Sequence, residues 1–352
     1  MNTMNGKIYI VMPCYKAEAY IEDTLNDILA QTYTNWELIC VSNGAGQEPQ
    51  LKILERFSRT GRIKILTEEK GDRCRARNIG IKAATGEWIT FSDADDRIEP
   101  DHLQRYMDKA REEEADIIMG GHKQIRVKEG TVIERRFPAK KQTLNEVIMT
   151  AGSALNCVWD KIFRASFLKQ SGVLFHEDLD FFEDIIFVQE TLLLKPRVST
   201  LEMGGYRWIC RDEVSGCSTY RVHFWKSYMY ARDVERRLLS MAGCTEGELA
   251  TRMSQSDYIQ GYFFVCNLFK KGSPLSFGEA RREIKRVIFD DASMRQAIDS
   301  QDRAGHNLFL KIYDWTYRLG SAWWMAAVFQ LQYSLKYSMM PLYLKIVPRL
   351  RR

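Results

Sequence analysis

Short apolar segments alternate with amphipathic ones over the first hundred residues, and this alternation limits the fold more than any other feature of the sequence. Segments rich in apolar and β-branched residues occupy positions 7–12, 36–41, 63–66 and 88–91. Apolar residues recur at helical spacing over the intervening positions 18–31, 51–57 and 74–84. Strands joined by single helices are crossover units, so the sequence predicts an α/β fold with a mostly parallel, buried sheet flanked by helices.

The later sequence predicts a second, helical part. Positions 116–137 suggest two strands around the turn Glu129-Gly130, and helices are expected at 144–165 and 183–194. Beyond position 221 the pattern is helical throughout. Two of these helices are expected to begin at capping boxes, Thr245-x-x-Glu248 and Ser276-x-x-Glu279. We therefore expect an α/β domain over 1–220 and an α-helical region over 221–352.

The composition excludes several classes of protein. The eight cysteines are scattered and none belongs to a C-x-x-C pair, which argues against zinc ribbons, thioredoxin-type sites and secreted disulfide scaffolds. No strand is followed by G-x-G-x-x-G, so a dinucleotide-dependent dehydrogenase is not expected. The first residues lack the apolar run and cleavage site of a signal peptide. We expect a protein of the reducing cytoplasm.

Positive charge and aromatic residues are concentrated near the C-terminus. Positions 303–352 contain eight basic residues, one acid (Asp314) and three tryptophans (Trp315, Trp323 and Trp324). This composition favours peripheral contact with an anionic membrane, expected to be the inner face of the cell membrane. The alternative is a terminal helix pair that packs on the protein itself. No nucleic-acid partner is expected, because the basic residues are sparse and no binding motif accompanies them.

A dense group of acids follows the segment at 88–91. Asp93, Asp95 and Asp96 lie within four residues, and their charges repel unless a cation neutralises them. Open α/β sheets bind ligands at the carboxyl ends of their strands. Hard oxygen ligands of this kind suit Mg²⁺ or Mn²⁺ bound to phosphate oxygens. The alternative is a solvated turn in which Asp96 caps a helix.

Several sequence segments before and after this acidic group indicate what it does. The segment VMPCYKAEAYIEDTLNDILAQTYTNWELICVSNGA resembles the opening of inverting glycosyltransferases of family 2, where one strand ends in Pro-x-Tyr-Asn and the next in Val-Asp-Asp-Gly-Ser. GDRCRARNIGIKAATGEWITFSDADDRIEP resembles the family's Ala-Arg-Asn-x-Gly helix followed by Phe-x-Asp-x-Asp-Asp. VWDKIFRASFL and LDFFEDIIFVQETLLL resemble its Trp-x-Lys-x-x-Arg segment and its Glu-Asp pair. The sequence over roughly 7–220 thus resembles a family 2 glycosyltransferase with the GT-A fold.

The resemblance implies a nucleotide-sugar side within 1–100 and an acceptor side within 101–220. The residues it implies in nucleotide-sugar binding are Pro13, Tyr15, Ser42, Asn43, Arg75, Arg77, Asp93 and Arg211. It gives Asp95, together with Asp93, the role of holding Mn²⁺ or Mg²⁺, and it gives Asp184 the role of catalytic base. The residues implied to support the site or to contact the acceptor are Glu183, Trp159 and Lys161.

Two positions depart from the family's pattern. Lys16 stands where the family usually has Asn, and Ser42-Asn43 stands where it has two acids. The first of those acids normally contacts the base, commonly uracil, and Ser42 can form a hydrogen bond there without bringing a charge. We therefore expect a UDP-sugar donor.

Each implied role has a structural alternative. Arg75 and Arg77 would be solvated helix residues, Trp159 a packing aromatic and Lys161 a surface cation. Glu183 and Asp184 would be acids in the first turn of a helix, where the dipole favours negative charge. The five histidines show no metal-ligand spacing, so they are expected to be non-functional unless His122 or His176 reaches the site.

The sequence thus predicts a metal-dependent inverting glycosyltransferase that moves a sugar from a nucleotide-sugar to an acceptor hydroxyl on a glycan or lipid-linked glycan, in cell-surface polysaccharide synthesis. The alternative is a non-catalytic sugar-nucleotide or glycan-binding protein of the same fold. The presence of Asp93, Asp95 and Asp184 favours the enzyme. A sugar-nucleotidyltransferase would carry a Gly-rich loop after the first strand, and VMPCYKAEAY contains no glycine.

Overall fold

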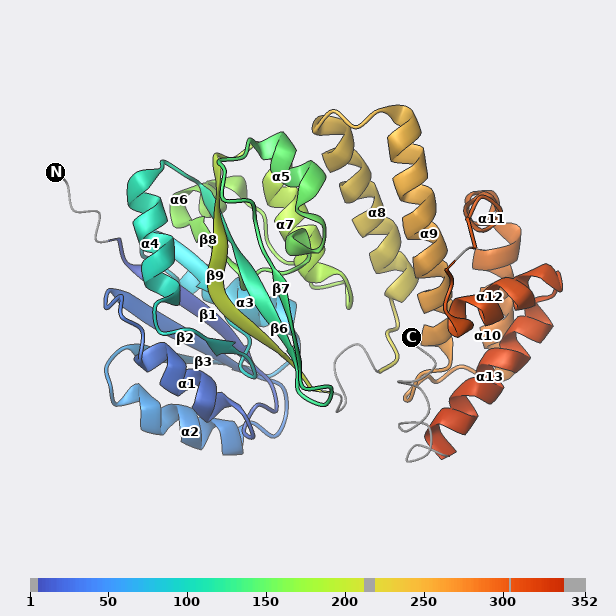
Figure 1. Cartoon of the computed structure of the whole chain (residues 1–352). Helices are drawn as coiled ribbons and strands as arrows, with labels where there is room; N and C mark the ends of the chain where they lie inside the picture. The colour runs from blue at the N-terminus through green and yellow to red at the C-terminus, as the bar shows by residue number, and fades with distance from the viewer. Residues whose placement is uncertain (1–5, 212–218, 304, 339–352) are drawn as a thin grey trace. The chain divides into compact units, whose positions relative to one another are not determined.

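The computed structural model describes residues 6–211, 219–303 and 305–338 (Figure 1). The chain divides into two compact units. The first, here called the α/β unit, comprises residues 1–212 and 233–243, and the second, the helical unit, comprises residues 213–232 and 244–352. Lys345, Arg349, Arg351 and Arg352, which contribute to the predicted basic tail, lie outside the described residues.

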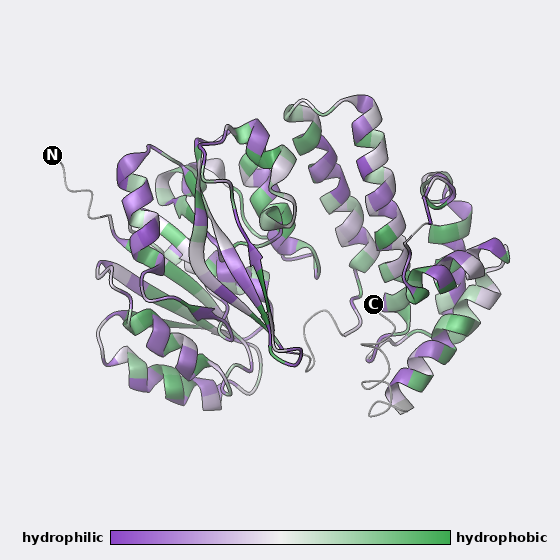
Figure 2. Cartoon of the chain, in the orientation of Figure 1, coloured by the Kyte–Doolittle hydropathy of each residue, from purple (hydrophilic) through white to green (hydrophobic). Residues whose placement is uncertain are grey.

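The α/β unit is built on one mixed sheet with the strand order β3-β2-β1-β4-β8-β6-β9-β5, and β7 pairs with β6. The strands are β1 Ile8–Cys14, β2 Trp36–Asn43, β3 Ile63–Glu68, β4 Trp88–Phe91, β5 Arg97–Ile98, β6 Ile117–Arg126, β7 Thr131–Arg135, β8 Lys161–Arg164 and β9 Val198–Cys210. The first four strands are mutually parallel, as predicted. The ribbons of β1 and β2 are largely green in Figure 2, as expected for strands buried on both faces.

Helices cover both faces of the parallel strands. The helices of this unit are α1 Ile21–Leu29, α2 Glu48–Ser58, α3 Arg73–Ala83, α4 His102–Glu112, α5 Leu144–Thr150, a 3₁₀ helix Gly152–Asn156, α6 Ala165–Ser171 and α7 Glu183–Leu193. On one face, Ile8, Ile10 and Met12 of β1 join a core that includes residues of α1, α2 and α4. On the other face, Val11 meets α3 at Gly80. Alternate residues of β1 therefore serve the two layers.

The structure corrects the predicted helix at 144–165. The helix α5 ends at Thr150, and 161–164 forms strand β8, which pairs antiparallel with both β4 and β6. Ile162 and Phe163 are fully buried there, so tertiary pairing overrides the local helical pattern. The long strand β9 was not expected either, because Gly204 and Gly205 and several charged residues interrupt its apolar pattern.

From position 224 onward the residues that the structure describes are mainly helical, as predicted. Its helices are α8 Phe224–Met241, α9 Glu246–Leu268, α10 Phe277–Ile284, a π-helical segment Lys285–Asp290, α11 Ala292–Asp299, α12 Leu308–Arg318 and α13 Ala322–Ser338. Both predicted capping boxes are confirmed, with Thr245 at the start of α9 and Ser276 at the start of α10. Among the helices that the structure describes, none combines the length and apolar character needed to cross a membrane.

The close approach of α3 to β1 depends on Gly80. A Cβ atom at this position would lie 2.2 Å from Cγ1 of Val11. Because β1 is fully buried at Val11 and cannot yield, a larger residue would push α3 away from the sheet. The glycine of the Ala-Arg-Asn-x-Gly motif therefore has a packing role.

We expect Gly80→Ala to lower the free energy of unfolding by about 1–3 kcal/mol through overpacking. The matched control is Gly247→Ala on α9, where a Cβ atom would meet nothing within 4 Å and helix propensity predicts a small gain. Urea unfolding followed by circular dichroism measures both variants. Equal stability of the two variants would contradict the packing role of Gly80.

Candidate active site

The predicted site residues gather at the carboxyl edge of the parallel strands. Tyr15 follows β1, Ser42 and Asn43 end β2, and Asp93 follows β4. This is the edge where open α/β sheets bind ligands. Residues from α3, α7 and β9 complete the site.

Asp96 fixes the acidic segment to strand β9. Its carboxylate accepts hydrogen bonds from the Tyr206 hydroxyl at 2.8 Å and from the Ile209 backbone N–H at 2.8 Å. The backbone N–H of Asp93 in turn donates to the Tyr206 hydroxyl at 3.1 Å. Asp96 is buried, and α4 is capped at Asp101. The alternative of a solvated turn in which Asp96 caps a helix is therefore wrong.

Asp95 is the acid of this segment that solvent reaches most easily. Its side chain is 55% exposed, and Nη1 of Arg211 lies 3.6 Å from its carboxylate and donates to its backbone carbonyl at 2.6 Å. Desolvation and the neighbouring Asp93 raise the pKa of Asp95. Negative charge is thus incompletely balanced here, and the hard oxygen donors of Asp95 and Asp93 fit Mg²⁺ or Mn²⁺ with further ligands from a phosphate.

Arg77 joins the acidic segment to the predicted catalytic base. Its guanidinium donates to the Asp184 carboxylate at 2.6 Å and to the Asp93 carboxylate at 2.9 Å. Only 2% of Arg77 is exposed, and its planar group lies over the ring of Phe175 at 5.2 Å. The alternative of a solvated helix residue is therefore wrong for Arg77, whose two Nη atoms bind the two carboxylates.

The helix α7 carries both acids of the Glu-Asp pair into the site. Phe182, just before the helix, has φ of 64°, an uncommon value for a bulky residue. Glu183 is buried and forms two contacts with Arg73, at 2.5 and 2.9 Å. Asp184 instead faces Arg77 with one fifth of its side chain exposed. Glu183 is thus held within the fold while Asp184 remains within reach of solvent.

The electrostatics of Asp184 suit proton transfer. Burial raises its pKa to about 7, with Glu183 and Asp93 acting in the same direction and Arg77 opposing them. A carboxylate with a pKa near neutrality can take a proton from a hydroxyl and release it at the pH of the cell.

The predicted nucleotide-binding residues divide into exposed and buried groups. Tyr15 is 52% exposed, and its ring lies against Gly44 and Gly71, where a Cβ atom at Gly44 would be 2.6 Å from the ring. Ser42 and Asn43 are buried: the amide of Gln50 donates to Ser42 Oγ at 2.7 Å, and Asn43 donates to the carbonyl of Cys14 at 3.0 Å. Their side chains therefore hold the loops together.

Two other predicted nucleotide-binding residues lie at the rim. Pro13 is in β1, opposite Val41 of β2. Arg75 lies on the surface, where it binds Glu68 at 2.7 Å and lies 3.6 Å from Glu177. Arg75 and Arg77 thus occupy different environments although a single residue separates them on one helix.

The segment before β8 forms a buried network behind the acids. Lys161 is fully buried and binds Asp160 at 2.5 Å, so the alternative of a surface cation is wrong. Asp160 also contacts His122 at 2.9 Å and Cys157 at 3.4 Å. These three side chains could in principle hold a metal ion, but the Lys161 ammonium already neutralises Asp160. The network is accounted for as a structural ion pair.

Trp159 supports the acidic segment through aromatic packing. Its ring stacks on Tyr206 at 4.3 Å, and Tyr206 is the residue that binds Asp93 and Asp96. Trp208, also on β9, lies 6.2 Å from Trp159 and is 41% exposed. Sequence analysis missed Arg73, Tyr206 and Trp208. The Tyr-x-Trp spacing places the two aromatics on one face of a strand, but only a predicted β9 would have revealed it.

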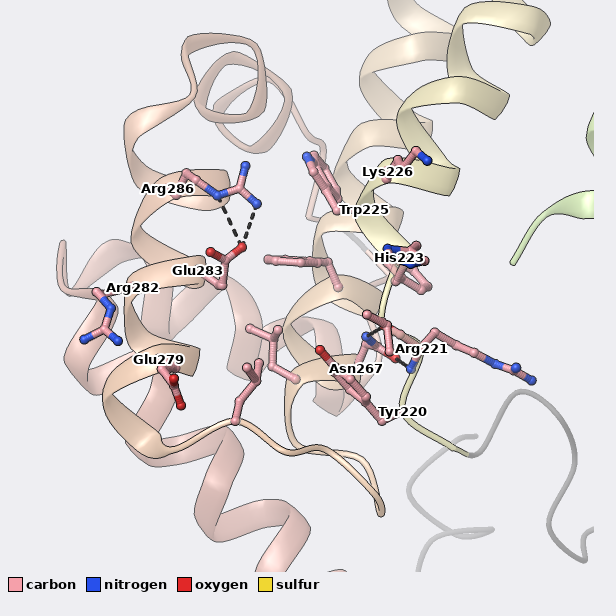
Figure 3. Close-up of a pocket in the computed structure, with 15 residues that line it drawn as sticks. Tyr220, Arg221, His223, Trp225, Lys226, Asn267, Glu279, Arg282, Glu283 and Arg286 are labelled. Atoms are coloured by element: carbon pink, nitrogen blue, oxygen red, sulfur yellow. Dashed lines mark hydrogen bonds and ion pairs between the residues drawn. The ribbon is translucent and has the colours of Figure 1, made fainter. Parts of the chain in front are cut away.

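A cavity of about 590 Å³ lies elsewhere, within the helical unit. Figure 3 shows its lining, which includes Trp225 and the ion pair between Arg286 and Glu283. None of the predicted site residues lines it. The candidate active site is therefore the open carboxyl edge of the sheet.

We expect Arg77→Met to lower the free energy of unfolding by roughly 3 kcal/mol at pH 8, because two partly buried carboxylates lose their partner. The loss should be smaller at pH 6, where Asp184, with its pKa near 7, is largely protonated and needs no counter-charge. Arg75→Met, on the same helix, is the control and should change stability little, because its ion pairs are solvated. Urea titrations at both pH values test this, and equal losses in the two variants would contradict the bridging role.

Comparison with known proteins agrees with the resemblance in the sequence. The model of the family described as Glycosyl transferase family 2 matches residues 9–172. An uncharacterized glycosyltransferase, EpsJ of Bacillus subtilis, is 29% identical over 205 residues, which cover 56% of this chain and 60% of EpsJ. The poly(ribitol-phosphate) β-N-acetylglucosaminyltransferase TarS of Staphylococcus aureus is 27% identical over 59% of this chain and 36% of TarS. The chain spans less than two thirds of the length of these curated relatives.

The solved structures extend the similarity in fold. The crystal structure of S. aureus TarS 1–349 in complex with UDP-GlcNAc superimposes with a TM-score of 0.59 at 19% identity, covering 90% of this chain and 92% of that one. The predicted GT-A type fold with a helical C-terminal region is confirmed by this similarity. The chain therefore carries a glycosyl transferase family 2 domain over residues 9–172.

Proposed function

We propose that this protein is a metal-dependent inverting glycosyltransferase, which moves a sugar from a UDP-sugar to an acceptor hydroxyl. The observation that carries the proposal is the Arg77 bridge, because it joins the acids suited to a metal–diphosphate group to a carboxylate suited to act as a base. A donor held at Asp93 and Asp95 and an acceptor held at Asp184 would lie close enough to react with each other. A non-catalytic binding protein would have no use for the raised pKa of Asp184.

The donor binds along the carboxyl edge of β1, β2 and β4 in this proposal. The exposed ring of Tyr15, beside Gly44 and Gly71, offers a face on which the base can stack. TarS, a structural neighbour, was crystallised with UDP-GlcNAc, and this supports a UDP-sugar. Arg211 lies close enough to Asp95 to contact the diphosphate.

Asp95 and Asp93 would hold Mn²⁺ or Mg²⁺. A bound divalent ion supplies Lewis-acid stabilisation of the diphosphate leaving group. The Arg77 guanidinium donates a hydrogen bond to the Asp93 carboxylate, and the Tyr206 hydroxyl accepts one from the backbone N–H of Asp93. The Asp93 carboxylate is therefore positioned before any ligand arrives.

Asp184 takes the proton of the acceptor hydroxyl as its oxygen bonds to the anomeric carbon from the face opposite the leaving group. The bond to the diphosphate breaks with its electron pair, so the configuration inverts and an α-linked donor gives a β product. Glu183, held by Arg73, fixes the first turn of α7 from which Asp184 projects. Trp208 offers an exposed aromatic surface beside this site for an acceptor sugar.

The acceptor in this proposal is a glycan or lipid-linked glycan of cell-surface polysaccharide synthesis. One relative, WfgD of Escherichia coli, is named a UDP-Glc:α-D-GlcNAc-diphosphoundecaprenol β-1,3-glucosyltransferase and is 31% identical over 44% of this chain. Such an acceptor would lie in the membrane, so the protein would act from the cytoplasm at its inner face, in contact through its C-terminal part.

We expect Asp184→Asn to lower the transfer rate by roughly 10²–10⁴-fold while UDP binding persists, because the amide keeps the shape and loses the basicity. Glu183→Gln should lower it less. In the wild type, kcat/KM should rise with pH up to about 7, since the base must be unprotonated, and then level off. Donor and acceptor assays from pH 5.5 to 9 measure this, and near wild-type transfer by Asp184→Asn would place the base elsewhere.

We expect Asp95→Ala to abolish transfer and the enhancement of UDP binding by Mn²⁺, with little loss of stability, because Asp95 is half-exposed. Asp108→Ala, an acid of similar exposure on α4, is the control and should behave as wild type. Isothermal titration with UDP, with and without Mn²⁺, separates binding from catalysis. Full wild-type activity in excess chelator would refute the metal requirement.

A further inference from the structure

Large apolar side chains are exposed together where α12 meets α13. Trp315 and Leu319 lie at the end of α12, and Trp323 and Trp324 at the start of α13, each between 43% and 52% exposed. The two tryptophan rings of α13 touch edge to face at 4.7 Å. We call these four residues, with Lys311 and Arg318, the aromatic corner. Single exposed apolar residues are ordinary, but four within ten positions mark an interaction surface.

The aromatic corner lies on the exposed side of α12 and α13, whose opposite side is buried within the protein. On α12 the exposed Lys311, Trp315 and Arg318 recur at helical spacing, while Tyr313 and Thr316 are buried. On α13 the buried residues are Met325, Ala326 and Phe329. Leu331 and Leu335 extend the exposed apolar surface along α13. The alternative of a helix pair packed on the protein thus accounts for only one side of these helices.

The exposed charges that α12 and α13 contribute to this surface have one sign. Between positions 308 and 338 the sequence contains a single acid, Asp314, which is buried and binds Tyr258 at 2.9 Å and His306 at 2.9 Å. Lys311 and Arg318 form no ion pair among the residues that the structure describes. The described parts of α12 and α13 therefore contribute cations and indole rings to the corner and no exposed carboxylate of their own.

We infer that the aromatic corner binds the headgroup region of an anionic bilayer. Indole rings settle at the boundary between headgroups and acyl chains, and lysine and arginine beside them bind lipid phosphates. A second copy of this chain fits less well, because like charges at Lys311 and Arg318 would face each other. This inference deepens the proposed function, since it would bring the enzyme to a lipid-linked acceptor, but the surface is argued from its own residues.

The test is sedimentation of the full-length protein with vesicles of phosphatidylcholine and phosphatidylglycerol in a 7:3 ratio. We expect binding at low salt that weakens as salt rises. The triple variant Trp315→Ala, Trp323→Ala, Trp324→Ala should bind at least tenfold more weakly. The double variant Lys311→Gln, Arg318→Gln should also lose on the order of tenfold, because each cation near an anionic surface adds to binding.

Two matched controls separate this surface from general effects. Arg236→Gln with Arg237→Gln removes the same net charge from exposed positions on α8, and Val132→Ser removes an exposed apolar residue from β7. Both should bind like wild type. The charge variant alters only exposed side chains, so it tests the inference even if the tryptophan variant folds poorly.

Three results would overturn the inference: no wild-type binding at low salt, equal binding by the corner variants and the controls, or concentration-dependent self-association through the corner without vesicle binding. Mn²⁺-stimulated release of UDP from UDP-sugars, measured in the absence of vesicles, is recorded for every variant. If UDP release persists while vesicle binding is absent, the surface fails and the proposed chemistry stands. If vesicle binding persists while UDP release is absent, the proposed chemistry fails and the membrane-binding surface stands.

Discussion

The ion-pair bridge of Arg77 is the interaction on which the rest of the site depends. One guanidinium binds Asp184 and Asp93, which belong to segments 91 positions apart in the chain. A guanidinium has a rigid fork of donors, so it fixes the distance between the two carboxylates as well as balancing their charge. A lysine at this position would offer a single point charge and no such geometry. The separation between the leaving-group side and the base side of the site is therefore set by one side chain.

The fold gives Arg77 little freedom. The helix α3 is capped by Asp72, whose carboxylate accepts from the N–H groups of Cys74 and Arg75, and Gly80 lets the same helix lie directly on β1. Arg77 lies between Asp72 and Gly80 in the sequence of α3, and its guanidinium lies over the ring of Phe175. The short segment from Asp72 to Gly80 thus combines a cap, a buried cation and a packing glycine, and each has a separate physical reason.

Local patterns were sufficient for the parallel strands, which are short and mainly apolar, and for the group of acids Asp93, Asp95 and Asp96 that follows β4. Glu183 and Asp184 were predicted only through the resemblance to family 2 glycosyltransferases. What could not be predicted depends on partners that the local pattern does not reveal. β8 forms because β4 and β6 flank it, and Lys161 is buried because its ammonium binds Asp160 and the backbone carbonyls of Ala154 and Cys157. For the same reason Arg75 and Arg77 look alike in the sequence, although one is solvated and the other is the buried bridge. The buried hydrogen bond of Ser42 likewise depends on Gln50, which belongs to the next helix, and that of Asn43 depends on the carbonyl of Cys14 in β1.

The charges of the site give an independent reason for a divalent cation. The site contains five carboxyl groups: Asp93, Asp95, Asp96, Glu183 and Asp184. Contacts link four of them to only three guanidinium groups, those of Arg73, Arg77 and Arg211, and Asp96 binds the Tyr206 hydroxyl and the Ile209 N–H instead. The shortage of positive charge agrees with the raised pKa values of Asp95, Asp96 and Asp184, to which burial also contributes. A sugar-nucleotide adds about two further negative charges through its diphosphate. Its binding beside Asp93 and Asp95 would meet repulsion on both sides, whereas the same diphosphate paired with a divalent ion carries almost no net charge. The arrangement of acids that looks unfavourable for a nucleotide alone is thus suited to a metal–nucleotide complex.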